Sequence, residues 1–144
     1  MPADAAWPLL SDVLASVSAM ALSIGMVTVD CADPKALSGF WAAALDTEVL
    51  QNYEDAFIML APSPRGGPAL AFQLVPEPRS GKNRLHLDLG APVGERQAEV
   101  ERLVALGATV LGERGDPSVF TWTTLTDPEG NEFCVGEQEG SPLE

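Results

Sequence analysis

The sequence predicts an α+β protein made of two βαβββ modules, which form a cupped mixed sheet with the helices on its outer face. The first observation is that the order of one strand, one helix and three strands occurs twice, over residues 25–77 and 83–138. The second is an echo at the same place in both units, LDTEVL at residues 45–50 and LGATVL at residues 106–111. The third is a length of 144 residues, which suits one domain. We therefore expect a single domain over residues 25–138.

Both ends of the chain differ from this pattern. Residues 1–24 form an N-terminal extension in which apolar side chains recur at steps of three and four, at Trp7, Leu10, Leu14, Val17 and Met20. This spacing predicts a short amphipathic helix, although a frayed extension is an equal alternative. Residues 139–144 form an acidic tail.

The first module begins with an alternating segment, residues 26–31, which predicts a half-buried strand. Asp33 and Pro34 then supply an N-cap and a first-turn proline, and Phe40 and Trp41 are the main apolar anchors of the helix that follows. Three short strands complete the module, at residues 47–50, 56–60 and 69–75.

The second module repeats this order after a linker at residues 76–82, which is rich in proline and glycine. An alternating strand at residues 85–89 precedes a helix at residues 95–106, and Gly107 ends that helix. The remaining strands are expected at residues 109–111, 119–124 and 133–135, the last one after the turn Asp127-Pro128-Glu129-Gly130.

Candidate site residues follow from strand parity. Because helices must cover one face of each half-sheet, the side chains of opposite parity should line a shared cleft. This parity selects Met26, Thr28, Asp30, Gln73, Arg84, His86, Asp88, Glu132 and Cys134, and we expect Trp122 at the cleft mouth. A semi-polar lining of this kind is typical of a small-molecule site.

His86 is the single histidine of the chain. One interpretation is an imidazole held by a hydrogen bond beside Asp88, with a purely structural role. The other is acid–base catalysis, in which Asp88, Asp30 or Glu132 orients the ring. Cys134 is first a small packing residue, because no sequence-local feature activates its thiol.

Charge restricts the class of partner. Against 21 acidic residues there are 8 basic ones, and the net charge of −13 would repel nucleic acid and anionic membranes. Two cysteines are too few for a secreted disulfide framework. No basic residue precedes Lys35, and no apolar run is long enough to span a bilayer. These features predict a cytoplasmic protein that binds a small molecule.

Three motifs in this order resemble the vicinal-oxygen-chelate superfamily, which includes glyoxalases, bleomycin-resistance proteins and dihydroxybiphenyl dioxygenases. They are the segment at residues 29–34 leading into Phe40-Trp41, the segment KNRLHLDL at residues 82–89, and DPEGNEF at residues 127–133. Together they most resemble the glyoxalase-like subgroup of actinobacteria. The resemblance implies the two-module fold, and it implies a homodimer.

Metal-dependent members of that superfamily hold an ion with four side chains, usually histidines and glutamates. The matching positions here are Met26, Gln73, His86 and Cys134, with Glu132 as a possible substitute. His86 alone is a usual ligand, and the Met26 thioether does not suit Mg²⁺, Mn²⁺, iron or nickel. The resemblance therefore implies a degenerate metal site, and we expect no bound metal or other cofactor.

Two functions remain open. The first is a metal-independent lyase, isomerase or cyclase, in which His86 with Asp88, Asp30 or Glu132 moves protons on a carbonyl-bearing substrate while the other cleft residues bind it. The second is a non-catalytic protein that sequesters an antibiotic or other secondary metabolite. A small number of expected cleft aromatics slightly favours the enzyme.

Overall fold

The computed structural model describes residues 21–138, so the expected N-terminal helix lies outside the described residues. The first module consists of β1 (Met26–Cys31), α2 (Pro34–Ala44), β2 (Val49–Tyr53), β3 (Phe57–Leu60) and β4 (Ala69–Leu74). The second consists of β5 (Leu87–Pro92), α3 (Arg96–Leu106), β6 (Thr109–Asp116), β7 (Phe120–Thr126) and β8 (Glu132–Gln138). Within the described residues, no helix is long and apolar enough to cross a membrane.

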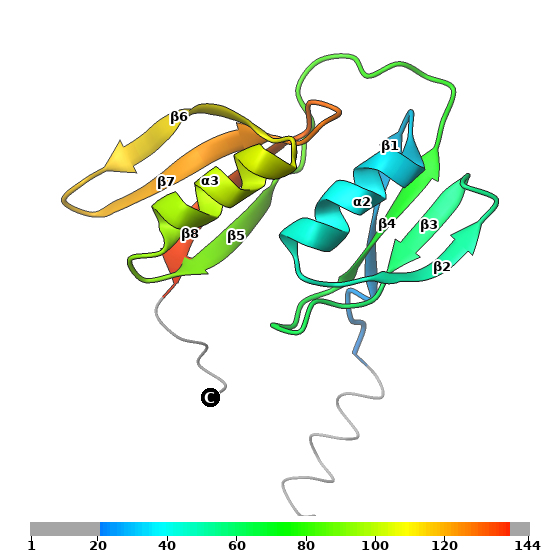
Figure 1. Cartoon of the computed structure of the whole chain (residues 1–144), viewed down its shortest axis with the longest axis horizontal. Helices are drawn as coiled ribbons and strands as arrows, with labels where there is room; N and C mark the ends of the chain where they lie inside the picture. The colour runs from blue at the N-terminus through cyan, green and yellow to red at the C-terminus, as the bar shows by residue number, and fades with distance from the viewer. Residues whose placement is uncertain (1–20, 139–144) are drawn as a thin grey trace, which may run out of the picture.

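Each module has its own four-stranded mixed sheet, with the order β1-β4-β3-β2 in one and β5-β8-β7-β6 in the other. The first strand of each module runs parallel to the last, and the other pairs are antiparallel. The two sheets lie side by side, and α2 and α3 cover the same side of the molecule (Figure 1). The α+β fold with two modules is therefore confirmed. The opposite face of each sheet, here called its open face, is covered by no helix of the described residues.

Local chemistry accounts for both helices. The Asp33 carboxylate accepts a hydrogen bond from the Ala36 backbone N–H at 3.1 Å, and Pro34 occupies the first helical turn of α2. The helix α3 ends at Gly107, whose φ of 124° is readily adopted by glycine. The helix α2 begins where the Asp33-Pro34 cap predicted, and α3 begins and ends within one residue of the expected positions.

One hydrophobic core joins the two modules. It combines Leu37, Phe40 and Trp41 of α2 with residues from both sheets, among them Phe72 and Phe133, each at most 1 % exposed. The ring of Trp41 meets that of Phe133 edge to face, with centroids 5.0 Å apart. Burial of these large side chains supplies the main favourable term in folding.

The turn at residues 127–130 also ties the modules together. The carboxylate of Asp127, which is 4 % exposed, accepts a hydrogen bond from the indole Nε1 of Trp41 at 3.1 Å. The Glu129 carboxylate accepts the backbone N–H groups of Ala32 at 2.7 Å and Asp33 at 3.0 Å. Residues 127–130 therefore form the expected turn and also hold the start of α2 in place by hydrogen bonds.

The strands of the second module differ most from expectation. β6 was expected to end at residue 111, but it pairs with β7 as far as Asp116. Gly112 and Gly115 resemble strand breakers, yet Gly112 sits at a register shift and both are accommodated at positive φ. β5 begins at Leu87, so the expected strand start at Leu85 was wrong and His86 immediately precedes the strand. Leu85 is 66 % exposed for the same reason.

Candidate functional site

A cavity of about 700 Å³ lies on the open face of the second sheet. All of its lining residues come from residues 82–137. They are Lys82, His86, Asp88, Leu89, Leu111, Arg114, Phe120, Trp122, Thr124, Glu132, Cys134, Gly136 and Glu137. Its volume is within the range of small-molecule sites.

One end of the cavity is polar. His86 Nδ1 lies 3.2 Å from Asp88 Oδ1, with the two side chains 46 % and 71 % exposed. Asp88 is the register partner of Cys134 on the neighbouring parallel strand β8. Glu132, at the start of β8, is held by an ion pair between its Oε2 and Lys82 Nζ at 3.3 Å. The strand alternation that singled out these residues in the sequence therefore brings them to one wall.

The thiol of Cys134 belongs to the same end. Its sulfur lies 3.6 Å from the hydroxyl oxygen of Thr124 on β7. Burial is the main cause that raises the pKa of the Cys134 thiol, and the charges of Asp88 and Glu132 raise it further, against a lowering by the Thr124 hydrogen bond. The thiol is therefore neutral at neutral pH, which suits a hydrogen-bonding wall better than a nucleophile.

The other end of the cavity is aromatic. Phe120 and Trp122 alternate along β7 on the open face, and their rings stack with centroids 5.9 Å apart and an interplanar angle of 27°. Arg114 on β6 is the register partner of Trp122. Phe120, Arg114 and Lys82 were missed in the sequence. The period-two pattern Phe120, Trp122, Thr124 was the signal that could have found Phe120.

The remaining candidates lie elsewhere. Met26, Thr28, Asp30 and Gln73 are exposed on the open face of the first sheet, where Asp30 and Gln73 are register partners, and none of the four lines the cavity. Arg84 is exposed in the segment before β5 and is also absent from the lining.

Register also relates the two modules position by position. Val27 pairs with Leu70, and Leu87 pairs with Phe133 in the same parallel arrangement. With Val27 placed on Leu87, as the motif spacing implies, the structural counterpart of His86 is Met26. The counterpart of Cys134 is Ala71, which lies two residues before Gln73.

His86, Asp88 and Cys134 are also the described residues best placed to hold a metal ion, since their ligand atoms lie within 4.8 Å of one another. A set of imidazole, carboxylate and thiolate suits zinc, whereas Mg²⁺ and Mn²⁺ prefer mainly oxygen donors. A thiol must also lose its proton to bind a metal, and the raised pKa of Cys134 opposes this at neutral pH. The donors therefore do not fit hard divalent ions such as Mg²⁺ and Mn²⁺.

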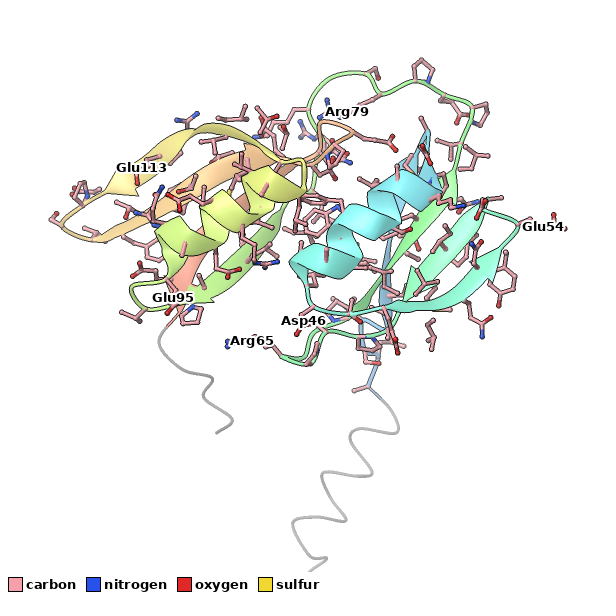
Figure 2. The ribbon with its side chains drawn as sticks, viewed as in Figure 1. Asp46, Glu54, Arg65, Arg79, Glu95 and Glu113 are labelled. Carbon is pink, nitrogen blue, oxygen red and sulfur yellow. The ribbon has the colours of Figure 1, made fainter. Side chains whose placement is uncertain are left out.

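A second hollow, of about 540 Å³, lies at the seam between the modules. Asp46, Arg65 and Glu95 lie on its rim, at the lower edge of the molecule where the two modules meet (Figure 2). The Arg102 guanidinium spans this seam and donates to the backbone carbonyls of Ala43 at 3.0 Å and Ala44 at 2.9 Å. These bonds satisfy backbone carbonyl groups at the end of α2, so Arg102 has a structural role where the two modules meet.

The sequence profile of the glyoxalase-like domain family matches residues 26–136, from the first residue of β1 into β8. The chain belongs to this family. The matched part of the glyoxalase-like domain contains both open faces and the whole polar end of the cavity. No curated protein matches the sequence.

Solved structures share the fold of this glyoxalase-like domain at low sequence identity. A glyoxalase/bleomycin resistance protein/dioxygenase family enzyme from Burkholderia phytofirmans PsJN has a TM-score of 0.69 and 19 % identity, with 81 % of this chain and 98 % of that chain covered. A point mutant of the fosfomycin resistance protein FosX from Listeria monocytogenes, complexed with Mn(II) and 1S,2S-dihydroxypropylphosphonic acid, has a TM-score of 0.68 and 13 % identity, covering 83 % and 91 %. TioX from Micromonospora sp. ML1 has a TM-score of 0.56 and 15 % identity, covering 82 % and 100 %. The likeness to these three structures shows a shared fold.

Proposed function

We propose that the protein is a cytoplasmic, metal-independent lyase, isomerase or cyclase that moves protons on a carbonyl-bearing small molecule. The observation that carries the proposal is the 3.2 Å contact between His86 and Asp88 on the wall of the 700 Å³ cavity, beside Cys134 and Glu132. The same motifs that carry the family resemblance support an assignment to the actinobacterial glyoxalase-like subgroup.

His86 would act as the general base and acid. Asp88 Oδ1, 3.2 Å from Nδ1, would orient the ring so that Nε2 takes a proton from the substrate and returns it. Glu132, positioned by Lys82, is the second carboxylate at this end and would orient the substrate or carry a second proton. No step requires a metal ion.

The proposal includes a homodimer in which a second copy completes the pocket. Met26 is 41 % exposed on the open face of the first sheet, and Thr28, Asp30 and Gln73 are exposed on the same face. None of the four lines the cavity of its own chain. Placed opposite the second sheet of another copy, these four residues would form the missing wall. Asp30 would then add a carboxylate to the proton-transfer site and Gln73 an amide to bind the substrate.

Mixing variants tests the shared pocket. Asp30→Asn and His86→Asn each inactivate every homodimer, whereas a heterodimer of the two has one intact pocket. Unfolding at low denaturant and refolding of an equal mixture should restore about a quarter of wild-type activity by random pairing. A mixture as inactive as its components, or a monomeric mass in solution, would contradict the shared pocket.

A non-catalytic binding protein is the second candidate, and the stacked pair Phe120 and Trp122 favours it, contrary to the expectation of few cleft aromatics. The two candidates differ in turnover. Ligands found by thermal shift should exchange the hydrogen α to their carbonyl in D2O if His86 catalyses proton transfer, as followed by proton NMR. Tight binding without catalysed exchange or product formation for any ligand would favour sequestration.

A further inference from the structure

The aromatic end of the cavity is a flat platform open to solvent. Phe120 is 51 % exposed although it stacks on Trp122, so one ring of the pair still presents apolar surface to water. Large exposed aromatic surface inside a concave site is typical of a place where a ligand stacks.

Two glycines make room for these rings. A Cβ added at Gly136 would lie 2.8 Å from Cζ of Phe120, whereas one at Gly115 would clash first with the backbone oxygen of Phe120 and lie 2.9 Å from Cζ3 of Trp122. A larger residue at Gly136 would push the Phe120 ring away from the sheet, and one at Gly115 would displace the backbone of β7 as well as the Trp122 ring. The platform is therefore built by the backbones of β6 and β8 as well as by β7.

Among residues 21–138, the cavity lining has one cation with no carboxylate partner, Arg114, and one further carboxylate, Glu137. Lys82 is paired with Glu132 and His86 contacts Asp88. Arg114, beside Trp122 in the register, forms no ion pair with any carboxylate of residues 21–138, and its Nη1 donates to the Glu113 carbonyl at 3.2 Å. In a chain of net charge −13, an unpaired guanidinium at the end of an aromatic platform is an attractive position for an anion.

The strand register gives the distance from the aromatic pair to the polar end of the cavity. Trp122 and Thr124 are successive open-face residues of β7, and Thr124 is the partner of Cys134. Two residues along a strand span roughly 7 Å, so a substituent of that length on a stacked ring would reach the wall formed by His86, Asp88 and Cys134.

We propose that the ligand is an aromatic carboxylate or a similar aryl anion, whose ring stacks on Phe120 and Trp122 and whose anionic group pairs with Arg114. This ligand class rests on the proposed function, because both take the same cavity as the ligand site. A second substituent on the ring would carry the carbonyl to His86.

Calorimetric titration with three matched probes tests the ligand class. The probes are 2-naphthoate, its neutral analogue 2-naphthamide, and decahydro-2-naphthoate, which keeps the charge but has no aromatic ring. We expect 2-naphthoate to bind about tenfold more tightly than either analogue, because each analogue lacks one of the two interactions. Equal affinity of the amide would overturn the role of the anion, and equal affinity of the saturated acid would overturn stacking.

Variants test whether Arg114 and the Phe120 ring cause the preference for naphthoate. Arg114→Gln should remove the preference for naphthoate over naphthamide, whereas Arg65→Gln, an exposed arginine outside this cavity, should keep it. Gly136→Ala should weaken naphthoate about tenfold by displacing Phe120, whereas Gly25→Ala, where a Cβ meets nothing within 4 Å, should not. An Arg114→Gln protein that keeps the full preference would overturn the proposal.

The two proposals fail differently. His86→Asn should still bind 2-naphthoate, because His86 lies at the polar end. Selective aryl-anion binding with no His86-dependent proton exchange for any ligand contradicts the proposed enzyme and leaves the ligand class standing. His86-dependent exchange on ligands that lack a ring or an anion contradicts the ligand class and leaves the enzyme standing.

Discussion

The two modules share one backbone plan and differ in what their open faces carry. Position by position, Met26 corresponds to His86, Thr28 to Asp88, Ala69 to Glu132 and Ala71 to Cys134. At these positions the first module has a thioether, a hydroxyl and the methyl groups of two buried alanines, where the second has an imidazole, two carboxylates and a thiol. Groups capable of proton transfer are concentrated in the second module, with Asp30 as the exception on the first.

The covered faces of the two sheets, in contrast, are chemically alike. Val27, Val29, Leu70 and Phe72 of the first module correspond to Leu87, Leu89, Phe133 and Val135 of the second, and all eight are apolar and pack in or against the core. A duplicated fold therefore constrains one face of each sheet by packing and leaves the other face free to diverge in chemistry.

The largest expected effect tests the chemical difference between the open faces. His86→Asn should reduce proton exchange on a bound ligand by about 10² to 10⁴-fold, the usual contribution of a general acid–base group. The NMR exchange assay in D2O measures this rate. The unfolding midpoint should change little, because the His86 side chain is 46 % exposed. Unchanged exchange would remove His86 from the mechanism.

A pair of tryptophan variants tests the difference between covered and open faces. Trp41→Phe removes the hydrogen bond to the buried Asp127 carboxylate and should lower the free energy of unfolding by about 1–3 kcal/mol. Trp122→Phe removes no hydrogen bond formed within residues 21–138 and should cost less than about 1 kcal/mol. Urea denaturation measures both, and equal losses would contradict this account of the covered face.

A smaller effect distinguishes the first module at alkaline pH. Burial, with added repulsion from Glu129, Asp33 and Asp30, raises the pKa of the Cys31 thiol from 9.0 to about 11. The unfolded chain therefore releases this proton at lower pH than the folded protein, so stability is full below pH 9 and falls as pH rises toward 11.

Cys31→Ala should make that decline shallower, although it lowers stability at neutral pH by leaving a small cavity. Denaturation series at several pH values compare the slopes. A slope identical to that of the wild-type protein would contradict the burial of this thiol.

Local sequence signals predicted most of the first module closely, although β2 is Val49–Tyr53 and not residues 47–50. The alternation of residues 26–31 and the Asp33-Pro34 cap gave β1 and α2 nearly to the residue. Strand parity also selected His86, Asp88, Glu132 and Cys134, which the structure brings to one cavity. Period-two alternation and capping are local properties, so sequence expresses them directly.

Long-range packing accounts for what the sequence did not predict. β6 extends through Gly112 and Gly115 because β7 pairs with it, and this extension carries Arg114 to its place beside Trp122. The Trp41–Asp127 and Glu129–Ala32 hydrogen bonds join the two modules between residues 86 and 97 positions apart in the chain. Neither arrangement has a local signature.

The most direct test of the central claim, proton transfer by His86 without a metal, is the exchange rate before and after exhaustive chelation. Wild-type protein with its metal content measured should keep its full rate when metal-free, and added Zn²⁺ should give no gain. Loss of exchange on chelation, with recovery on adding a stoichiometric divalent ion, would contradict the account and make His86, Asp88 and Cys134 metal ligands.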